Sequence, residues 1–367
     1  MHYLGGKHHP GNVSEVTDLA PASRIRLRTE GALGRITLDR PEAINALDLG
    51  MIRDITAALE AWMTDTDVQI VLLDGEGRGL CAGGDVRALY DQIVAGDAET
   101  TAEFFRAEYA LNAMIAEYRK PVIAFADGIT MGGGIGLAGH AAIRIVTERS
   151  RLAMPETRIG FTPDVGGTYL LGRAPGRLGE YLGLTGSTMS GADAVYTGFA
   201  DHFVPSDRLD AVREALAYRA DPTGPAELVL LFDETPEPSS LVEERAWIDD
   251  AFAAEDVAQI VERLRAREEP AAAEAADVLD ALAPTGLAVT LEAVREARGG
   301  DLRAALTGEY RRVMWFVHHH PDLVEGIRAQ LVDKDRNPRW QPATIAELPA
   351  DATTGAREFV PAEPLFD

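Results

Sequence analysis

Two carboxylates, Glu156 and Asp164, lie eight residues apart in the stretch AMPETRIGFTPDVGG, which is rich in glycine and proline. Each follows a proline, so the backbone around each is restricted. A carboxylate held on stiff backbone is suited to act as a general acid, a general base or a nucleophile. Either residue alone is better explained by a helix cap or a surface loop, but the pair in this setting favours catalysis.

Two glycine-rich loops, CAGGD from Cys81 to Asp85 and GITMGGGIGLAG from Gly128 to Gly139, each follow a buried apolar stretch. Glycine lets backbone N–H groups approach a ligand closely, and the start of a helix favours negative charge. If each loop donates one N–H, the two form an oxyanion hole for the carbonyl of a thioester. A tight turn ending in a helix cap at Asp85 explains CAGGD alone equally well.

A second interpretation of the later loop is a dinucleotide site. Gly134, Gly136 and Gly139 match G-x-G-x-x-G, and Glu156 follows about twenty residues on. The match lies in the middle of the chain rather than in a first βαβ unit, and it leaves CAGGD unexplained. We therefore favour the oxyanion hole.

Cysteine and histidine chemistry is weakly supported. Cys81 would need a histidine base, and neither His140 nor His202 lies in a motif known from cysteine enzymes. Cys81 is therefore predicted to be a small buried residue. The three adjacent imidazoles of residues 318–320 cannot share one helix face, so we expect no metal and no separate cofactor.

Composition limits the partners. The 367 residues carry a formal charge of −24, which disfavours nucleic acid and anionic lipid, and no apolar stretch is long enough to span a membrane. The lysines are Lys7, Lys120 and Lys334, so arginine must supply most cations. A single cysteine and the lack of an apolar secretory leader suggest the cytoplasm.

Apolar periodicity predicts an α/β fold. A hairpin is expected over 24–39, a helix opening at RPEAINAL, buried strands at 68–75, 121–128 and 142–148, and a helical stretch over 86–118. The organisation is predicted as a flexible tail at 1–23, a core with the active site at 24–205, a helical extension at 206–345 and a C-terminal tail at 346–367.

In this order and spacing, RPEAINAL, CAGGD, GITMGGG and PETRIGFTPDVGGTYLL resemble the enoyl-CoA hydratase/isomerase (crotonase) superfamily. The chain is most similar to its 3-hydroxyisobutyryl-CoA hydrolase branch, which APTGLAVTL and EGIRAQLVDKDRNPRW also resemble. The resemblance runs from about residue 24 to 345. It implies a crotonase (ClpP-like) spiral of ββα units followed by a helical C-terminal extension, an acyl-CoA substrate and a possible homo-oligomer.

The resemblance also implies roles for individual residues. Gly84 and Gly133 would donate the N–H groups of the oxyanion hole, and Glu156 and Asp164 would be the catalytic carboxylates. Glu156 would either attack the thioester or activate a water as a general base. The residues expected along the substrate are Ala82 and Gly83 near the coenzyme and Glu108 near the acyl group.

One departure separates the possible reactions. Enoyl-CoA hydratases hold one water with two glutamates; Gly136 stands at the first of these positions, and Asp164 is an added carboxylate. This favours a thioester hydrolase over the alternatives, a hydratase or isomerase of the superfamily and, more remotely, a non-catalytic acyl-CoA-binding protein. Candidates for contacts with the coenzyme A phosphates are Arg40, Arg78, Arg87 and Lys334.

Overall fold

The computed structural model describes residues 24–366, which contain two β-sheets. The larger sheet has the order β1-β2-β3-β5-β7-β9, and the smaller has the order β4-β6-β8. The strands are β1 (Ile25–Glu30), β2 (Leu33–Leu38), β3 (Ile70–Gly75), β4 (Gly79–Cys81), β5 (Val122–Ala126), β6 (Ile129–Met131), β7 (Ile143–Val146), β8 (Arg151–Ala153) and β9 (His202–Phe203). The tail predicted for residues 1–23 lies outside the described residues.

The pairing of the large sheet follows from its sequence. β1 and β2 form the predicted antiparallel hairpin, and the other pairs are parallel. The predicted strands at 68–75, 121–128 and 142–148 are β3, β5 and β7. The runs IVLLD and VIAFA within β3 and β5 are buried at every position, as expected for parallel strands covered on both faces.

The small sheet was not predicted, because three-residue strands carry too little periodicity. β4 comes after β3, β6 after β5 and β8 after β7, so the chain alternates between the two sheets. This alternation produces the spiral of ββα units. It also brings the two glycine loops together, because β4 and β6 are parallel neighbours and each ends at one of them.

Helices fill the rest of the spiral and the second half of the chain. Within the core they are α1 (Leu49–Thr64), α2 (Val86–Ala95), α3 (Ala98–Glu117), α4 (Gly133–Ala138), α5 (Gly167–Arg173), α6 (Leu178–Thr185) and α7 (Gly191–Thr197). After the last strand they are α8 (Leu209–Tyr218), α9 (Pro225–Val229), α10 (Ser240–Ala251), α11 (Val257–Arg265), α12 (Pro270–Ala281), α13 (Pro284–Ala297), α14 (Leu302–His319), α15 (Asp322–Ile327) and α16 (Thr354–Glu358).

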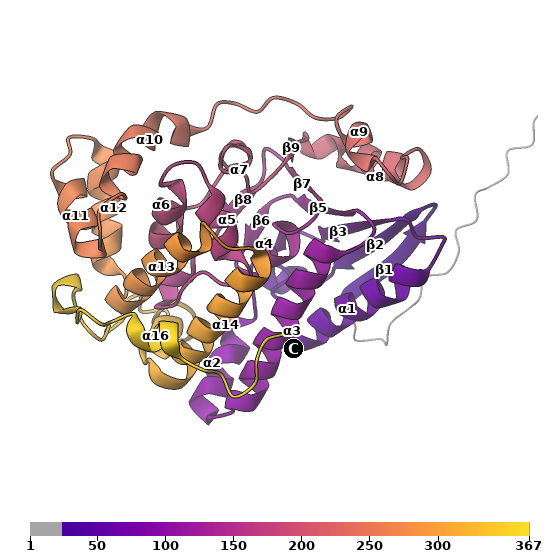
Figure 1. Ribbon diagram of the computed structural model, residues 1–367. Helices are drawn as coiled ribbons and strands as arrows, with labels where there is room; N and C mark the ends of the chain where they lie inside the picture. The colour runs from indigo at the N-terminus through magenta and orange to yellow at the C-terminus, as the bar shows by residue number, and fades with distance from the viewer. Residues whose placement is uncertain (1–23, 367) are drawn as a thin grey trace, which may run out of the picture.

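The helices after the core cover different sides of it. In Figure 1 the helices α10 to α13 lie on the side of the molecule away from β1, and α8 and α9 lie near β9. α13 packs against α5 and α6, and α14 packs against α3 and α5. One continuous apolar core includes residues from β1 through α16. Residues 346–366 thus contain a helix, α16, that packs on α14.

The first helix begins later than predicted. RPEAINAL forms a single 3₁₀ turn, and Ile44 and Asn45 then adopt positive φ angles of 50° and 56°, which a helix cannot accommodate. The Asn45 side chain donates hydrogen bonds to the carbonyls of Glu76 and Gly79, both at 3.0 Å. α1 starts only after Asp48, whose side chain accepts a hydrogen bond from the N–H of Met51.

This non-helical segment supports the first glycine loop. The N–H of Leu47 donates to the carbonyl of Gly83 at 2.8 Å, and the N–H of Asp85 donates to the carbonyl of Leu47 at 2.7 Å. Further along, the helical stretch predicted over 86–118 is two helices, because Gly96 ends α2 at a φ of 74° and Asp97 caps α3.

Of the helices in residues 24–366, none combines the length and apolarity that crossing a bilayer requires.

Replacing Gly79 by Ala should separate β4 from β6 and weaken the fold. A Cβ at Gly79 would stand 2.3 Å from the carbonyl oxygen of Ile129, and backbone cannot move aside without breaking the sheet. We expect a loss of about 1–3 kcal/mol of unfolding free energy, measured by denaturant titration. Gly299→Ala is the control, because its Cβ would meet nothing within 4 Å. Equal stability of the two variants would contradict this account of the small sheet.

Candidate active site

The two glycine loops meet at one point. Gly83 and Gly132 have φ angles of 113° and 49°, and these turns carry the chain past Gly84 and into α4 at Gly133. A Cβ on Gly133 would stand 3.3 Å from the amide nitrogen of Gly84. Within residues 24–366 neither the Gly84 nor the Gly133 N–H has a hydrogen-bond acceptor. Two free N–H groups on neighbouring loops have the geometry of an oxyanion hole.

Two carboxyl groups flank these N–H groups. Glu108 Oε1, on α3, lies 2.4 Å from where a Cβ on Gly133 would stand, and Glu156 Oε1 lies 3.0 Å from the same position on Gly132. Both side chains are buried. Glu108 Oε1 and Glu156 Oε2 have no hydrogen-bond partner among the described residues. Unpaired buried oxygens are costly, and such atoms at a cavity indicate contact with a ligand or water.

Asp164 completes the group of acids. It follows the 3₁₀ helix η2 (Glu156–Ile159), and its Oδ2 accepts a hydrogen bond from the hydroxyl of Tyr109 at 3.0 Å. Its side chain is 6% exposed, so the capping and surface-loop explanations do not apply to it. Glu156 is the first residue of η2 and is buried as well, at 7% exposure.

Burial decides the protonation of these acids. It raises the pKa of Glu108 and of Glu156 well above the usual range, and the charge of Asp164 raises both further. Burial also raises the pKa of Asp164 to about 7, although the Tyr109 hydrogen bond opposes this. Neighbouring carboxylates with little solvation cannot all be ionised together. The set can therefore hold and release a proton near neutral pH.

A cavity of about 550 Å³ contains these groups. All seven residues predicted from the sequence line it: Ala82, Gly83, Gly84, Glu108, Gly133, Glu156 and Asp164. Aromatic side chains from α3 and the Asp164 loop form part of its apolar wall: Phe104, Phe105 and Phe161. The sequence pattern placed the seven near one another, and the structure brings them into one site. Their individual roles stay predictions.

The C-terminal segment also lines the cavity, which was not predicted in this detail. Residues Gln330, Leu331, Arg336, Pro338 and Trp340 contribute to its wall. They come from the π-helical turn η4 (Arg328–Val332) and the loop after it. Arg328 fixes that loop through ion pairs to Glu325, Asp333 and Asp335 at 2.7–2.8 Å. The sequence signal was the stretch EGIRAQLVDKDRNPRW, which resembles the branch pattern but does not reveal where it folds.

The arginines predicted for coenzyme A phosphates do not line the cavity. Arg40 is paired with Asp85 at 2.8 Å, and Arg87 lies 3.8 Å from Asp91. The cations that line it are Arg158 and Arg336. Arg158 donates to backbone carbonyls at 3.0 and 3.2 Å. Within the described chain, the guanidinium of Arg336 has no carboxylate partner, although its residue lies at the cavity wall.

Lys334 and Arg78 complete the four predicted cations. Lys334 is exposed in the loop that precedes Arg336, and neither Lys334 nor Arg78 lines the cavity.

The rival interpretations of the glycine and cysteine motifs fail on packing. A Cβ on Gly134 would stand 2.3 Å from the carbonyl oxygen of Cys81, and one on Gly139 would stand 2.5 Å from Leu170. These glycines allow close packing inside the protein and do not line the cavity, so no dinucleotide site forms there. Cys81 is fully buried, as predicted, and burial raises the pKa of its thiol to about 12. A thiol that resists ionisation is a poor nucleophile.

Gly136 has no room for the first of the two hydratase glutamates. A Cβ there would stand 2.7 Å from Asn112 Nδ2 and 2.8 Å from Val165 Cβ. A glutamate at this position would therefore have to displace both neighbours.

Among residues 24–366, no three His, Cys, Asp or Glu side chains are arranged to hold a metal ion. The absence of a metal or separate cofactor stays a prediction, as does the homo-oligomer.

The chain belongs to the enoyl-CoA hydratase/isomerase family, whose profile matches residues 33–355. Among curated relatives, the mitochondrial 3-hydroxyisobutyryl-CoA hydrolase of Rattus norvegicus is 40% identical over 334 residues, covering 89% of this chain and 86% of that protein. The probable 3-hydroxyisobutyryl-CoA hydrolase 3 of Arabidopsis thaliana is 36% identical and covers 90% of each chain. The predicted family resemblance is confirmed.

Solved structures share the fold over most of the chain. A carnitinyl-CoA dehydratase from Mycobacterium thermoresistibile has a TM-score of 0.88 at 46% identity, covering 93% of this chain and 98% of that one. An enoyl-CoA hydratase from Rhodobacter sphaeroides has a TM-score of 0.85 at 40% identity, covering 92% and 98%. The predicted fold class is confirmed. The curated relatives are named as thioester hydrolases, whereas the two solved structures are named as enzymes that add or remove water. The residues of the site must therefore decide between these two kinds of reaction.

Replacing Asp164 by Asn should raise the melting temperature, and more at about pH 8 than at about pH 5. The pKa of Asp164 rises from 3.8 to about 7 on folding. The unfolded chain therefore loses this proton first, and the unfolding free energy falls as pH rises from about 4 to about 7. An asparagine at this position is uncharged in both the folded and the unfolded chain, so the variant avoids this loss of stability.

Differential scanning calorimetry across this pH range measures the effect. Glu214→Gln, which removes an exposed carboxylate on α8, is the control and should show a constant difference from the parent protein. A melting-temperature difference for Asp164→Asn that does not grow with pH would contradict the assigned direction of the pKa shift.

Proposed function

We propose that this protein is an acyl-CoA thioester hydrolase, and that its substrate is 3-hydroxyisobutyryl-CoA. The observation that carries the proposal is one cavity in which Glu156 and Asp164 face the free N–H groups of Gly84 and Gly133. The filled space around Gly136 supports hydrolysis over hydration. The names of the curated relatives support the 3-hydroxyisobutyryl group and, with it, a step of valine catabolism.

The geometry suggests how the residues divide the reaction. The thioester carbonyl oxygen binds the N–H groups of Gly84 and Gly133, which stabilise the negative charge that develops there. Glu156 attacks the carbonyl carbon, or removes a proton from the water that does so. The tetrahedral intermediate collapses, the carbon–sulfur bond breaks and the coenzyme A thiolate leaves. If Glu156 attacks directly, the acyl group remains on it as an anhydride, and a water molecule then hydrolyses that anhydride, which releases the free acid and restores the carboxylate. Asp164 orients the 3-hydroxyl group or the water, and its pKa of about 7 lets it move a proton.

Thiol release from 3-hydroxyisobutyryl-CoA tests the proposal, with acetyl-CoA and crotonyl-CoA measured alongside. We expect rapid release from the first substrate only. The names of the two solved structures favour hydration as the second candidate. Loss of the crotonyl-CoA enone absorbance without thiol release would support that candidate and reject the hydrolase.

The curated animal relatives are named mitochondrial. For this chain we propose the cytoplasm, because it has a single cysteine.

Glu156→Gln should lower the turnover number by about a hundredfold to ten-thousandfold and leave substrate binding nearly intact. The amide keeps the shape of the side chain but is neither a nucleophile nor a base. Steady-state kinetics and the binding of a non-hydrolysable substrate analogue measure the two effects. Glu180→Gln is the control, because Glu180 is also a buried glutamate but does not line the cavity. Unchanged turnover in Glu156→Gln would exclude Glu156 as the reacting group.

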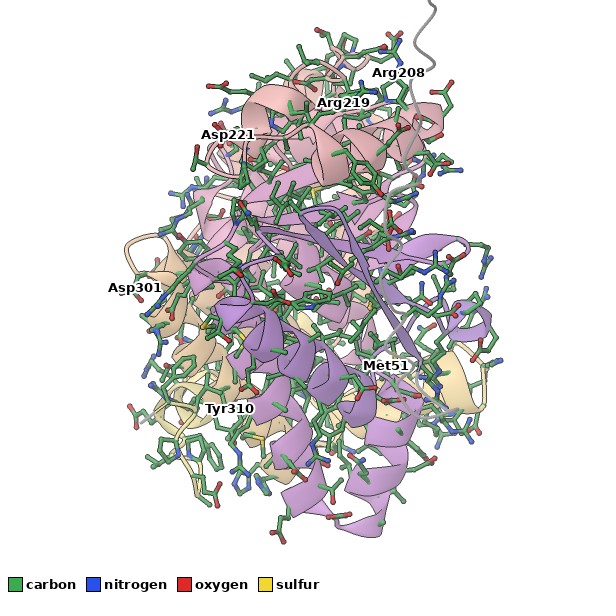
Figure 2. All side chains as sticks on the ribbon, turned by 90° about the vertical axis from the view of Figure 1, so that its right-hand side faces the viewer. Met51, Arg208, Arg219, Asp221, Asp301 and Tyr310 are labelled. Atoms are coloured by element: carbon green, nitrogen blue, oxygen red, sulfur yellow. The ribbon has the colours of Figure 1, made fainter. Side chains whose placement is uncertain are left out.

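Arg336→Ala should raise KM for the coenzyme A thioester by about three- to tenfold, because one charged hydrogen bond to a phosphate is lost. It should leave KM unchanged for the matching pantetheine thioester, which lacks the nucleotide phosphates. Arg219→Ala is the control: Arg219 is exposed at the end of α8, and in Figure 2 it lies at the end of the molecule away from Met51 and Tyr310. An equal change in KM for both thioesters would reject Arg336 as a phosphate contact.

A further inference from the structure

The backbone beside Asp164 adopts an unfavourable conformation. Val165 has a φ of 53° and Gly166 a φ of 78°. A β-branched residue rarely adopts a positive φ, because its side chain then crowds the neighbouring backbone. Local sequence therefore does not fix this turn. Contacts from elsewhere in the protein must stabilise it, and any change in the turn would move the carboxyl group of Asp164.

One buried carboxylate from α14 supplies most of these contacts. Glu309 Oε2 accepts a hydrogen bond from the N–H of Gly166 at 2.6 Å. Its Oε1 accepts from the N–H of Thr168 at 2.8 Å and from the Thr168 hydroxyl at 2.5 Å. Glu309 is 1% exposed and does not line the cavity. It binds the two N–H groups on either side of Gly167 and so fixes the chain directly after Asp164.

Neighbouring contacts complete the support. The ring of His140 lies 2.8 Å from the carbonyl oxygen of Val165 through its Nε2, and the N–H of Gly167 donates to the carbonyl of Asp164 at 2.6 Å. Tyr310, the residue after Glu309, packs its ring edge-on against Tyr109. Tyr109 in turn donates the hydrogen bond that holds the Asp164 carboxyl group. α14 therefore holds Asp164 through both its backbone and its side chain.

We propose that Glu309 is a positioning residue for Asp164: its carboxylate on α14 holds the 164–168 turn so that Asp164 faces the substrate. The assignment rests on the proposed hydrolase function. Glu309 acts without touching the substrate. Its role explains why a carboxylate is buried so far from water, since three donors converge on it. Burial raises the pKa of Glu309 to about 8, although the hydrogen bonds from Thr168 and Gly166 oppose this rise. In the charged form these hydrogen bonds are charge-assisted, and such bonds are stronger than neutral ones and restrict geometry more tightly.

Glu309→Gln tests the proposal with a minimal change. The amide has one acceptor oxygen, so it can bind Thr168 or Gly166 but not both, and its NH₂ group then faces an N–H donor. We expect the turnover number to fall by about ten- to a hundredfold, because a catalytic group is misplaced. We expect KM to change by less than about threefold, because Glu309 does not line the cavity and most of the wall lies outside the 164–168 turn.

Two comparisons separate positioning from simple loss of stability. Glu180→Gln removes another fully buried carboxylate, which is paired with Arg177 at 2.8 Å, and should lower the melting temperature without lowering turnover. The second comparison repeats Glu309→Gln in an Asp164→Asn background, with enzyme in excess over substrate so that slow rates are measured. If Glu309 acts through Asp164, the added loss there should shrink to less than about threefold.

Each result of these comparisons either supports or overturns the role of Glu309. A loss of turnover no larger than that of Glu180→Gln, or an equal loss with and without Asp164, overturns the proposal. Absence of thiol release from the unaltered protein would instead reject the hydrolase function itself. If Glu309→Gln does not fold, Thr168→Val removes only the hydroxyl bond to Oε1, and a smaller loss of turnover that depends on Asp164 is then expected. The same loss in both backgrounds rejects the role.

Discussion

Removing three acids from water in one cavity is the constraint on which the site depends. Burial makes the charged forms of Glu108, Glu156 and Asp164 less favourable than in solution, and the charge of Asp164 adds repulsion for the two glutamates. Such a set lowers the free energy of unfolding at neutral pH unless the rest of the chain compensates. The apolar core that extends from β1 to α16 supplies that compensation.

The fold must also bring the functional groups to one place in the right orientation. Oxyanion donors and acids must converge from segments far apart in the sequence, and the alternation between two sheets achieves this. β4 and β6 deliver the two N–H groups, while the acids come from α3, η2 and the following loop. The strands need only three residues each, because their role is to align loops and not to build a large sheet.

Sequence reasoning succeeded where the chemistry is local. Glycine runs after apolar strands, and carboxylates beside prolines, identified the two loops and the pair Glu156 and Asp164. The family resemblance supplied the remaining cavity residues, among them Glu108. Sequence analysis failed where a conformation depends on residues far away in the chain. The positive φ angles of Ile44 and Asn45 depend on hydrogen bonds to the loop around Glu76, so propensity alone suggested a helix. Glu309 lies more than 140 residues from the turn it binds, and Arg336 reaches the cavity only because Arg328 shapes its loop. No pattern in a single sequence reports such contacts.

The wall formed by residues 330–340 has a consequence for biosynthesis. A ribosome adds these residues after it has added the glycine loops and all three acids. A nascent chain stopped before them would contain the reactive groups but leave one side of the cavity open to water. Long-range closure of this kind is also slow, since distant segments must meet before the contact stabilises them. The cavity wall therefore closes only after residues 330–340 have been made, and a shorter product would lack it.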